Sequence, residues 1–133
     1  MKLERAIATG VTAIICAALL VTACRETIGP SPSGQLTVDV SAVGGPGAAF
    51  EVLVVGEDIT EPVVASPGDL LYSFASNDTV KVAVIGEHSS GPLFRFSVPD
   101  GSQATSYIVV LLEVSGSDNN LLSGGDFTLT ASD

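Results

Sequence analysis

The sequence predicts an all-β fold, an antiparallel β-sandwich of the jelly-roll or immunoglobulin-like type with about seven to nine short strands. From Leu36 onward, apolar and polar residues alternate with the period of two that a half-buried strand requires. The apolar runs are rich in Val and are separated by clusters of Gly, Pro, Asn and Asp, which favour turns. A helix is expected only in the apolar N-terminal stretch, because no segment after Cys24 has a helical period of useful length.

The first predicted strand shows the alternation most clearly. Within residues 36–41, Leu36, Val38 and Val40 share one face, and three polar residues share the other. A Gly-Gly-Pro-Gly break at residues 44–47 separates this strand from the next one. The strands predicted in the first part of the domain cover residues 36–41, 49–55, 63–65 and 70–74.

The later strands carry most of the aromatic residues. Phe94, Phe96 and Val98 alternate with polar residues and are predicted to point inward. Residues 106–114 are apolar on both faces, so we expect either a central strand or a strand that uses one face for binding. The later strands are predicted at residues 79–85, 93–98, 106–114 and 127–130, with a loop at 116–125.

The first 24 residues contain the three parts of an export signal in order. Lys2 and Arg5 form a short basic segment, an apolar segment follows, and the tetrapeptide Val-Thr-Ala-Cys ends it at residues 21–24. This tetrapeptide resembles the lipobox of a bacterial lipoprotein signal peptide. The resemblance implies cleavage after Ala23 and attachment of a diacylglyceryl group to the thiol of Cys24, which then becomes the N-terminus.

Two other interpretations of this segment stay open. One is an uncleaved transmembrane helix, although the uninterrupted apolar part is shorter than the ~20 residues that a span usually needs. The other is cleavage by the general signal peptidase, because Val21 and Ala23 satisfy its small-residue rule. Cys24 would then remain a free thiol. Cys16 is not a candidate for lipidation, since bulky isoleucines precede it.

The expected organisation is a signal peptide at residues 1–23, a Pro/Ser/Gly tether at 24–35 and a sandwich domain at 36–133. By resemblance to lipoproteins of this class, Cys24 carries three acyl chains, and two or more chains hold a protein firmly on a membrane. Arg25 follows the lipidated cysteine, which by the sorting habit of Gram-negative lipoproteins implies the outer membrane. The expected location is therefore the cell envelope, and the outer membrane if the host is Gram-negative.

The chain is strongly acidic, with 15 Asp and Glu against 5 Lys and Arg and a formal net charge of −10. Cleavage after Ala23 removes Glu4, Lys2 and Arg5 and leaves a net charge of −11. Such a surface repels phosphate groups, so we expect no nucleic-acid partner and a membrane contact through the lipid anchor alone. Both cysteines lie in the first 24 residues, so the domain is expected to have no disulfide and no cysteine metal site.

No arrangement of reactive residues predicts an enzyme. His88 is the single histidine and is expected at an exposed turn between strands. Ser89 has Gly91 after it but no Gly two residues before it, so the nucleophile-elbow pattern fails. Glu57 and Asp58 are neighbours in a predicted loop, where a solvated turn explains them better than a general acid/base pair. We therefore expect no catalytic residue and no cofactor.

Two further patterns concern ligands. Asp118, Asn119, Asn120 and Asp126 carry oxygen atoms suited to Ca²⁺, but the segment lacks the Gly and the closing Glu of a calcium loop. A turn explains it equally well, so no metal site is predicted. Exposed aromatic side chains are the usual readers of sugars, although core packing is the default for aromatics in strands. The aromatic candidates are Tyr72, Phe74, Phe94, Phe96 and Tyr107.

The order of features between residues 67 and 122 resembles a cohesin-type domain. The matching pieces are a Ser-Pro-Gly-Asp-Leu-Leu segment at 66–71, a Val-rich strand at 79–86, a turn and Phe-x-Val strand at 90–98, and an apolar strand with an Asp-Asn loop at 109–120. Cohesin-type domains are jelly-roll sandwiches that bind partner modules through one sheet face. The resemblance therefore implies a binding scaffold.

The expected function is a non-enzymatic, lipid-anchored domain of the cell envelope that presents a sheet face to a protein partner. A small carbohydrate-binding module that uses Tyr72 or Tyr107 is the alternative, and a purely structural envelope lipoprotein is a third. The residues that would bind a ligand are not identified by the sequence.

Overall fold

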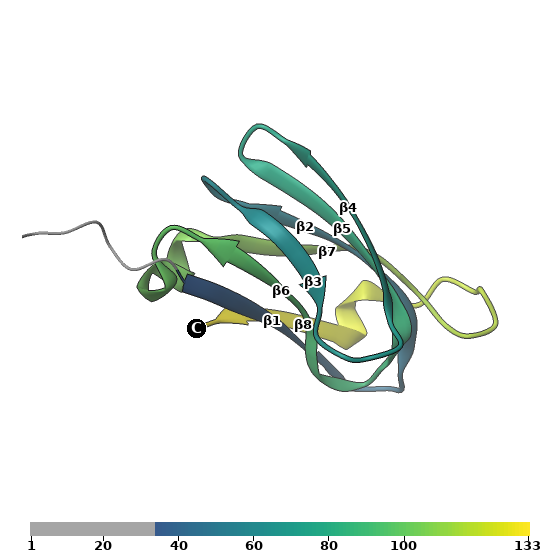
Figure 1. Cartoon of the computed structure of the whole chain (residues 1–133). Helices are drawn as coiled ribbons and strands as arrows, with labels where there is room; N and C mark the ends of the chain where they lie inside the picture. Colours follow the sequence, from purple (N-terminus) through teal and green to yellow (C-terminus); the bar gives the residue numbers. More distant parts are fainter. Residues whose placement is uncertain (1–33) are drawn as a thin grey trace, which may run out of the picture. The chain divides into compact units, whose positions relative to one another are not determined.

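The computed structural model describes residues 34–133, which form two four-stranded antiparallel β-sheets packed face to face (Figure 1). The predicted all-β sandwich is confirmed. The strands are β1 (Gly34–Ala42), β2 (Gly47–Val55), β3 (Thr60–Val64), β4 (Leu70–Ser76), β5 (Thr79–His88), β6 (Ser90–Val98), β7 (Ile108–Ser115) and β8 (Phe127–Ser132).

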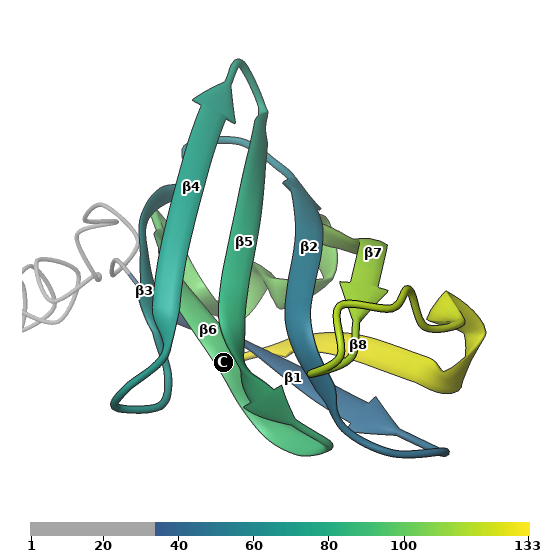
Figure 2. The same cartoon turned by 90° about the vertical axis from the view of Figure 1, so that its right-hand side faces the viewer.

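Sheet 1 has the strand order β3-β6-β1-β8, and sheet 2 has the order β4-β5-β2-β7. Within residues 34–133, β4 and β5 form the single hairpin that stays in one sheet, and every other connection passes from one sheet to the other. Figure 2 shows this hairpin rising at the top of the view. Its two-residue turn begins at Asn77, whose φ of 52° lies in the left-handed region that Asn tolerates.

The inner halves of the strands form one hydrophobic core. Leu36, Val38 and Val40 of β1 point inward, as do Phe94 and Phe96 of β6, so the predicted alternation of these two strands is confirmed. The buried apolar residues are Leu36, Val38, Val40, Phe50, Val52, Val54, Val80, Val82, Val84, Leu93, Phe94, Phe96, Val98, Val114 and Phe127. All of them lie within residues 36–127, so the described residues form a hydrophobic core of their own.

Strand β7 excludes one of its two predicted alternatives. It lies at the edge of sheet 2, so it is not a central strand, and the alternative of a strand that uses one face for binding stays a prediction. Leu112 is an extra residue in its ladder with β2, because Glu51 pairs with Glu113 and Val52 pairs with Leu111. This β-bulge reverses the alternation, so Val114 joins the core although the even-numbered residues before it face outward.

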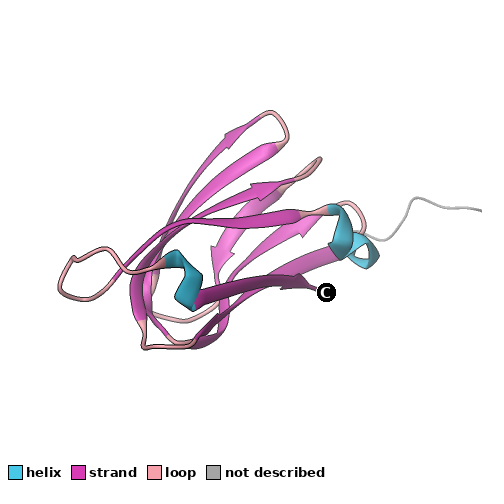
Figure 3. Cartoon of the chain, turned by 180° about the vertical axis from the view of Figure 1, so that it is seen from behind, coloured by secondary structure: helices cyan, strands magenta, loops and turns pink. Residues whose placement is uncertain are grey.

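Two short 3₁₀ helices interrupt the strand pattern, η1 (Gly101–Ser106) and η2 (Gly124–Asp126), both drawn in Figure 3. No helix was predicted between the strands at residues 93–98 and 106–114, where η1 lies. Strand β1 begins at Gly34, so the last two residues of the expected tether belong to the sheet. Since Thr37 of β1 pairs with Ser132 of β8, the chain enters and leaves the domain at the same end.

Candidate binding surface

The outer face of sheet 2 is apolar and exposed. Seven of its large side chains are solvent-exposed, and they come from three of its four strands. Those residues are Leu70, Tyr72 and Phe74 of β4, Ile85 of β5, and Ile108, Val110 and Leu112 of β7. We call this surface the apolar face. Large exposed apolar patches are uncommon on monomeric proteins, and they often mark interaction sites.

The centre of the apolar face carries one ion pair. Lys81 Nζ of β5 lies 2.8 Å from Glu51 Oε1 of β2. Glu113 of β7 stands opposite Glu51 in the ladder, so two carboxylates and one ammonium group lie in this part of the face. The face therefore has an apolar periphery and a small, net acidic centre.

Strand β4 is the most exposed part of this surface. Tyr72 is 63% exposed and Phe74 is 72% exposed, and both project from the outer side. Ser73 and Ala75 on the inner side are exposed as well, so this half of β4 has solvent on both faces. Of the five aromatic candidates from the sequence, these two lie on the surface, whereas Phe94 and Phe96 are fully buried.

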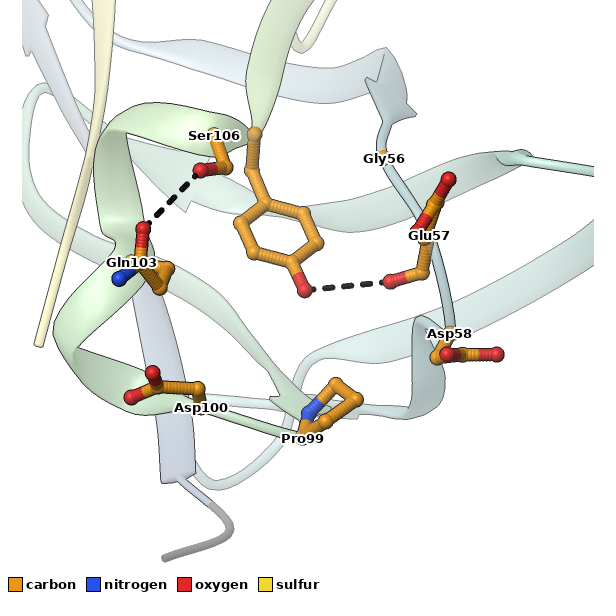
Figure 4. A pocket seen from close by; sticks show the side chains of 8 residues that line it. Gly56, Glu57, Asp58, Pro99, Asp100, Gln103 and Ser106 are labelled. Atoms are coloured by element: carbon orange, nitrogen blue, oxygen red, sulfur yellow. Dashed lines mark hydrogen bonds between the residues drawn. The ribbon is translucent and has the colours of Figure 1, made fainter. Parts of the chain in front are cut away.

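A surface hollow of about 480 Å³ lies at the end of the sandwich where the chain enters. Figure 4 shows Glu57, Asp58 and Asp100 around it. The fifth aromatic candidate, Tyr107, also lines the hollow. Its ring lies so close over Gly56 that a Cβ atom there would collide with it.

Burial and the acidic residues around this hollow contribute to a raised pKa of Tyr107. Its hydroxyl donates a hydrogen bond to the backbone carbonyl of Glu57, at 3.1 Å (Figure 4). Burial, together with the carboxylates of Asp58, Glu57 and Asp100, raises the pKa of Tyr107 above its ordinary value, because each disfavours the phenolate. Hydrogen bonds from the Ser102 hydroxyl and backbone N–H lower the pKa of Asp100. Glu57 and Asp58, the neighbouring carboxylates of the predicted loop, are exposed at the rim of this hollow.

The prediction for His88 was wrong. It is the last residue of β5 and only 8% exposed, because the strand continues past the predicted stop at Gly86. Its Nε2 atom lies 2.6 Å from Oδ2 of Asp69, and its ring packs edge-on against Phe50. The Asp69 carboxylate rests directly over Gly86, where any side chain would displace it.

The Asp69–His88 pair was missed because its members are far apart in the sequence and belong to no motif. The usable signal was Gly86, since a glycine inside a strand pattern often marks a close approach. The neighbouring Ser89 is exposed at the bend between β5 and β6. In this arrangement the pair ties the residue before β4 to the end of β5.

The predicted Asp-Asn loop forms a local turn. Asp118 accepts hydrogen bonds from the backbone N–H of Asn120 at 3.2 Å and from its side-chain amide at 2.7 Å, and these bonds lower the pKa of Asp118. Asp126 lies in η2, beside a second, smaller hollow. Across residues 34–133, no three His, Cys, Asp or Glu side chains come close enough together to hold a metal ion.

The expected cleavage site at Ala23 and lipid site at Cys24 lie outside the described residues. In the part of the chain that is described, no helix has the length and hydropathy that a membrane span requires. Comparison with known proteins gave no matching family model, no matching curated protein and no matching solved structure.

Proposed function

We propose that this chain is a non-enzymatic binding protein of the cell envelope that is anchored by lipid on Cys24 and binds a protein partner through the apolar face of sheet 2. The observation that carries the proposal is the exposure of seven large apolar side chains on that face. The outer face of sheet 1, in contrast, is lined mostly by hydroxyl and charged residues, and Val63 of β3 is its exposed large apolar side chain.

The apolar face suits a folded protein partner better than a phosphate-bearing ligand. Its centre holds Glu51 and Glu113 against a single Lys81, so it offers no cationic cluster to an anion. Exposed aromatic side chains such as Tyr72 and Phe74 belong to the residue types that are enriched in protein interfaces. A partner with a complementary apolar patch and a basic residue facing Glu113 fits this arrangement.

The direct test is capture of a partner from envelope extracts by the immobilised chain from residue 25 onward. The binding variant replaces Tyr72 and Phe74 with Ser, and the control replaces Thr128 and Thr130 on sheet 1 with Ala. We expect the face variant to lose at least about tenfold in affinity for the captured protein, as for two residues of an energetic centre. The control is expected to bind as the wild type does. Equal binding by both variants would exclude the apolar face.

The anchor has its own test. We expect the mature protein to have the mass of residues 24–133 plus a diacylglyceryl group and one amide-linked acyl chain, and the Cys24→Ser protein to remain uncleaved or to become soluble. Intact-mass measurement of material purified from membranes shows whether the chain is cleaved before Cys24 and whether Cys24 carries lipid. An unmodified Cys24 at the N-terminus, or retention of residues 1–23, would overturn the lipid anchor.

A carbohydrate-binding module is the second candidate, and the exposed pair Tyr72 and Phe74 favours it. They are two residues apart on one face of β4, where side chains lie close enough together to stack on neighbouring sugar rings. Glycan-array binding that is lost in Tyr72→Ala but kept in Tyr107→Ala would support this function. Loss in Tyr107→Ala alone would move the sugar site to the hollow at the chain-entry end.

A further inference from the structure

Strand β4 has a free edge, and that edge is a surface distinct from the apolar face. It is the end strand of sheet 2, and among residues 34–133 its backbone–backbone hydrogen bonds are those of its ladder with β5. In an antiparallel hairpin with a two-residue turn, alternate residues direct their N–H and C=O groups away from the partner strand. Counting from the pair Ser76–Thr79, these residues are Leu71, Ser73 and Ala75.

Two of the other three sheet edges are interrupted, whereas β4 is not. Strand β3 contains Glu61, at a φ of 50°, and Pro62, which break its register with β6. Strand β7 has its bulge, and the loop after it folds back so that the Leu122 N–H bonds to the Val114 carbonyl. Strand β8 is the fourth edge and is shorter, with six residues. Strand β4 contains no charge, no Pro and no bulge over its seven residues.

The sequence of β4 fits an antiparallel copy of itself. A two-fold axis at Ser73 pairs Ser73 with its symmetry mate through backbone hydrogen bonds, and pairs Leu71 with Ala75 in the same way. Tyr72 then lies opposite Phe74 twice, at the closer non-hydrogen-bonded positions on the outer face. Such cross-strand aromatic pairs are among the favourable ones in antiparallel sheets.

Charge also favours a second copy at this edge. The chain has a formal net charge of −10, so two copies repel each other unless they meet where neither is charged. Residues 70–77 contain no ionisable acid or base other than the hydroxyl of Tyr72. We propose that two copies of this chain pair through β4 to form one continuous eight-stranded sheet with a two-fold axis at Ser73.

This dimer does not depend on the partner binding proposed above. The Ser73 side chain points to the inner side of sheet 2, away from Tyr72 and Phe74, and it is exposed. A substitution at Ser73 therefore changes the edge while it leaves the apolar face and the core intact. A variant at this position is expected to retain capture of an envelope protein, so the two proposals can fail separately.

The experiment measures the mass of the chain from residue 25 onward by sedimentation equilibrium. Protein concentrations extend up to about 1 mM, because tethering two domains together can produce an effective concentration of that order. We expect a dimer for the wild type and a monomer for both Ser73→Lys and Ser73→Glu, because each places two like charges at the two-fold axis. An equimolar mixture of these two variants is expected to restore the dimer. Thr130→Lys on β8 is the matched control and leaves the wild-type dimer unchanged.

Three results would overturn the proposal. They are a wild-type chain that stays monomeric over the whole range, a dimer that survives both Ser73 substitutions, and a Lys and Glu mixture that remains monomeric. The proposal would also be wrong if the chain stays monomeric and an extended peptide of another protein pairs with the free edge of β4.

Discussion

The two sheets of this sandwich have the same number of strands and share one core, yet among residues 34–133 seven exposed large apolar side chains lie on the outer face of sheet 2, against Val63 on that of sheet 1. Sheet 1 presents Thr37, Asp39, Arg95, Thr128 and Thr130 to solvent. Sheet 2 presents leucine, isoleucine, valine, tyrosine and phenylalanine at the equivalent outward positions. Folding requires only the inner half of each strand to be apolar, so the fold does not account for the outer half of sheet 2. The exposed apolar residues on the outer side of sheet 2 are therefore the feature on which the proposed partner binding rests.

The largest expected effect is a difference in the free energy of unfolding between variants of two phenylalanines, one on the inner side and one on the outer side of sheet 2. Phe50 is 1% exposed and contacts the Phe127 ring at a centroid distance of 5.8 Å. Phe50→Ala is expected to lower the free energy of unfolding by about 3–5 kcal/mol. Phe74→Ala on the outer face is expected to change it by less than about 0.5 kcal/mol. Urea unfolding of both variants measures this, and similar losses would mean that the apolar face is structural.

The next effect concerns the pair that ties β4 into sheet 2. His88→Ala leaves the carboxylate of Asp69, a largely buried side chain, without its partner, so we expect a loss of about 3 kcal/mol. Amide hydrogen exchange should show lost protection in β4 and β5 before β1 and β6 are affected. Replacing both members, with Asp69→Leu and His88→Phe, is the control and should recover part of the loss. Uniform loss of protection over both sheets would contradict this local role.

The next prediction concerns the pKa of Tyr107 at the end of the sandwich, measured after Tyr72 on the apolar face has been replaced. The raised pKa of Tyr107 means that the folded chain holds this proton more tightly than the unfolded chain, so stability falls as pH rises from the unfolded value of about 10 through the folded one. In a Tyr72→Phe background, phenolate absorbance reports Tyr107 alone. We expect its apparent pKa to fall to the ordinary value when urea unfolds the chain. An identical titration in both states would contradict the contact with Glu57.

The smallest effect is expected at the ion pair within the apolar face. Lys81 and Glu51 are both partly exposed, so Lys81→Gln should cost only about 0.2–1 kcal/mol, and less at high salt. Double-mutant cycles with Glu51→Gln measure the coupling. A coupling well above this range would show that the centre of the face is shielded from water, as it would be if a second molecule covered it.

Residue patterns along the chain were enough to predict the strands but not their neighbours. The alternation of Val80, Val82 and Val84 around Lys81 predicts an inner and an outer face without any knowledge of the fold. The position of β7 at an edge was not predictable, because an apolar residue facing solvent and one facing a core look the same in a sequence. The bulge at Leu112 was hidden for the same reason.

The site was less predictable than the fold because its parts meet only in three dimensions. Tyr72 and Tyr107 were equal candidates in the sequence, yet one is exposed on a strand and the other packs over Gly56. Asp69 and His88 lie 19 positions apart and meet because β4 and β5 form a hairpin. The free edge of β4 follows from strand order alone, which no local pattern encodes.

The position of β1 has a mechanical consequence. The chain enters the domain at Gly34 and runs directly into a strand that lies between β6 and β8. A load applied through the preceding residues pulls along β1, while the ladder hydrogen bonds on both of its sides run across it. Because β1 has a neighbour on each side, such a load acts on two ladders together when it is resisted at the far end of the domain. The lifetime of the domain under tension is then set by its unfolding rate.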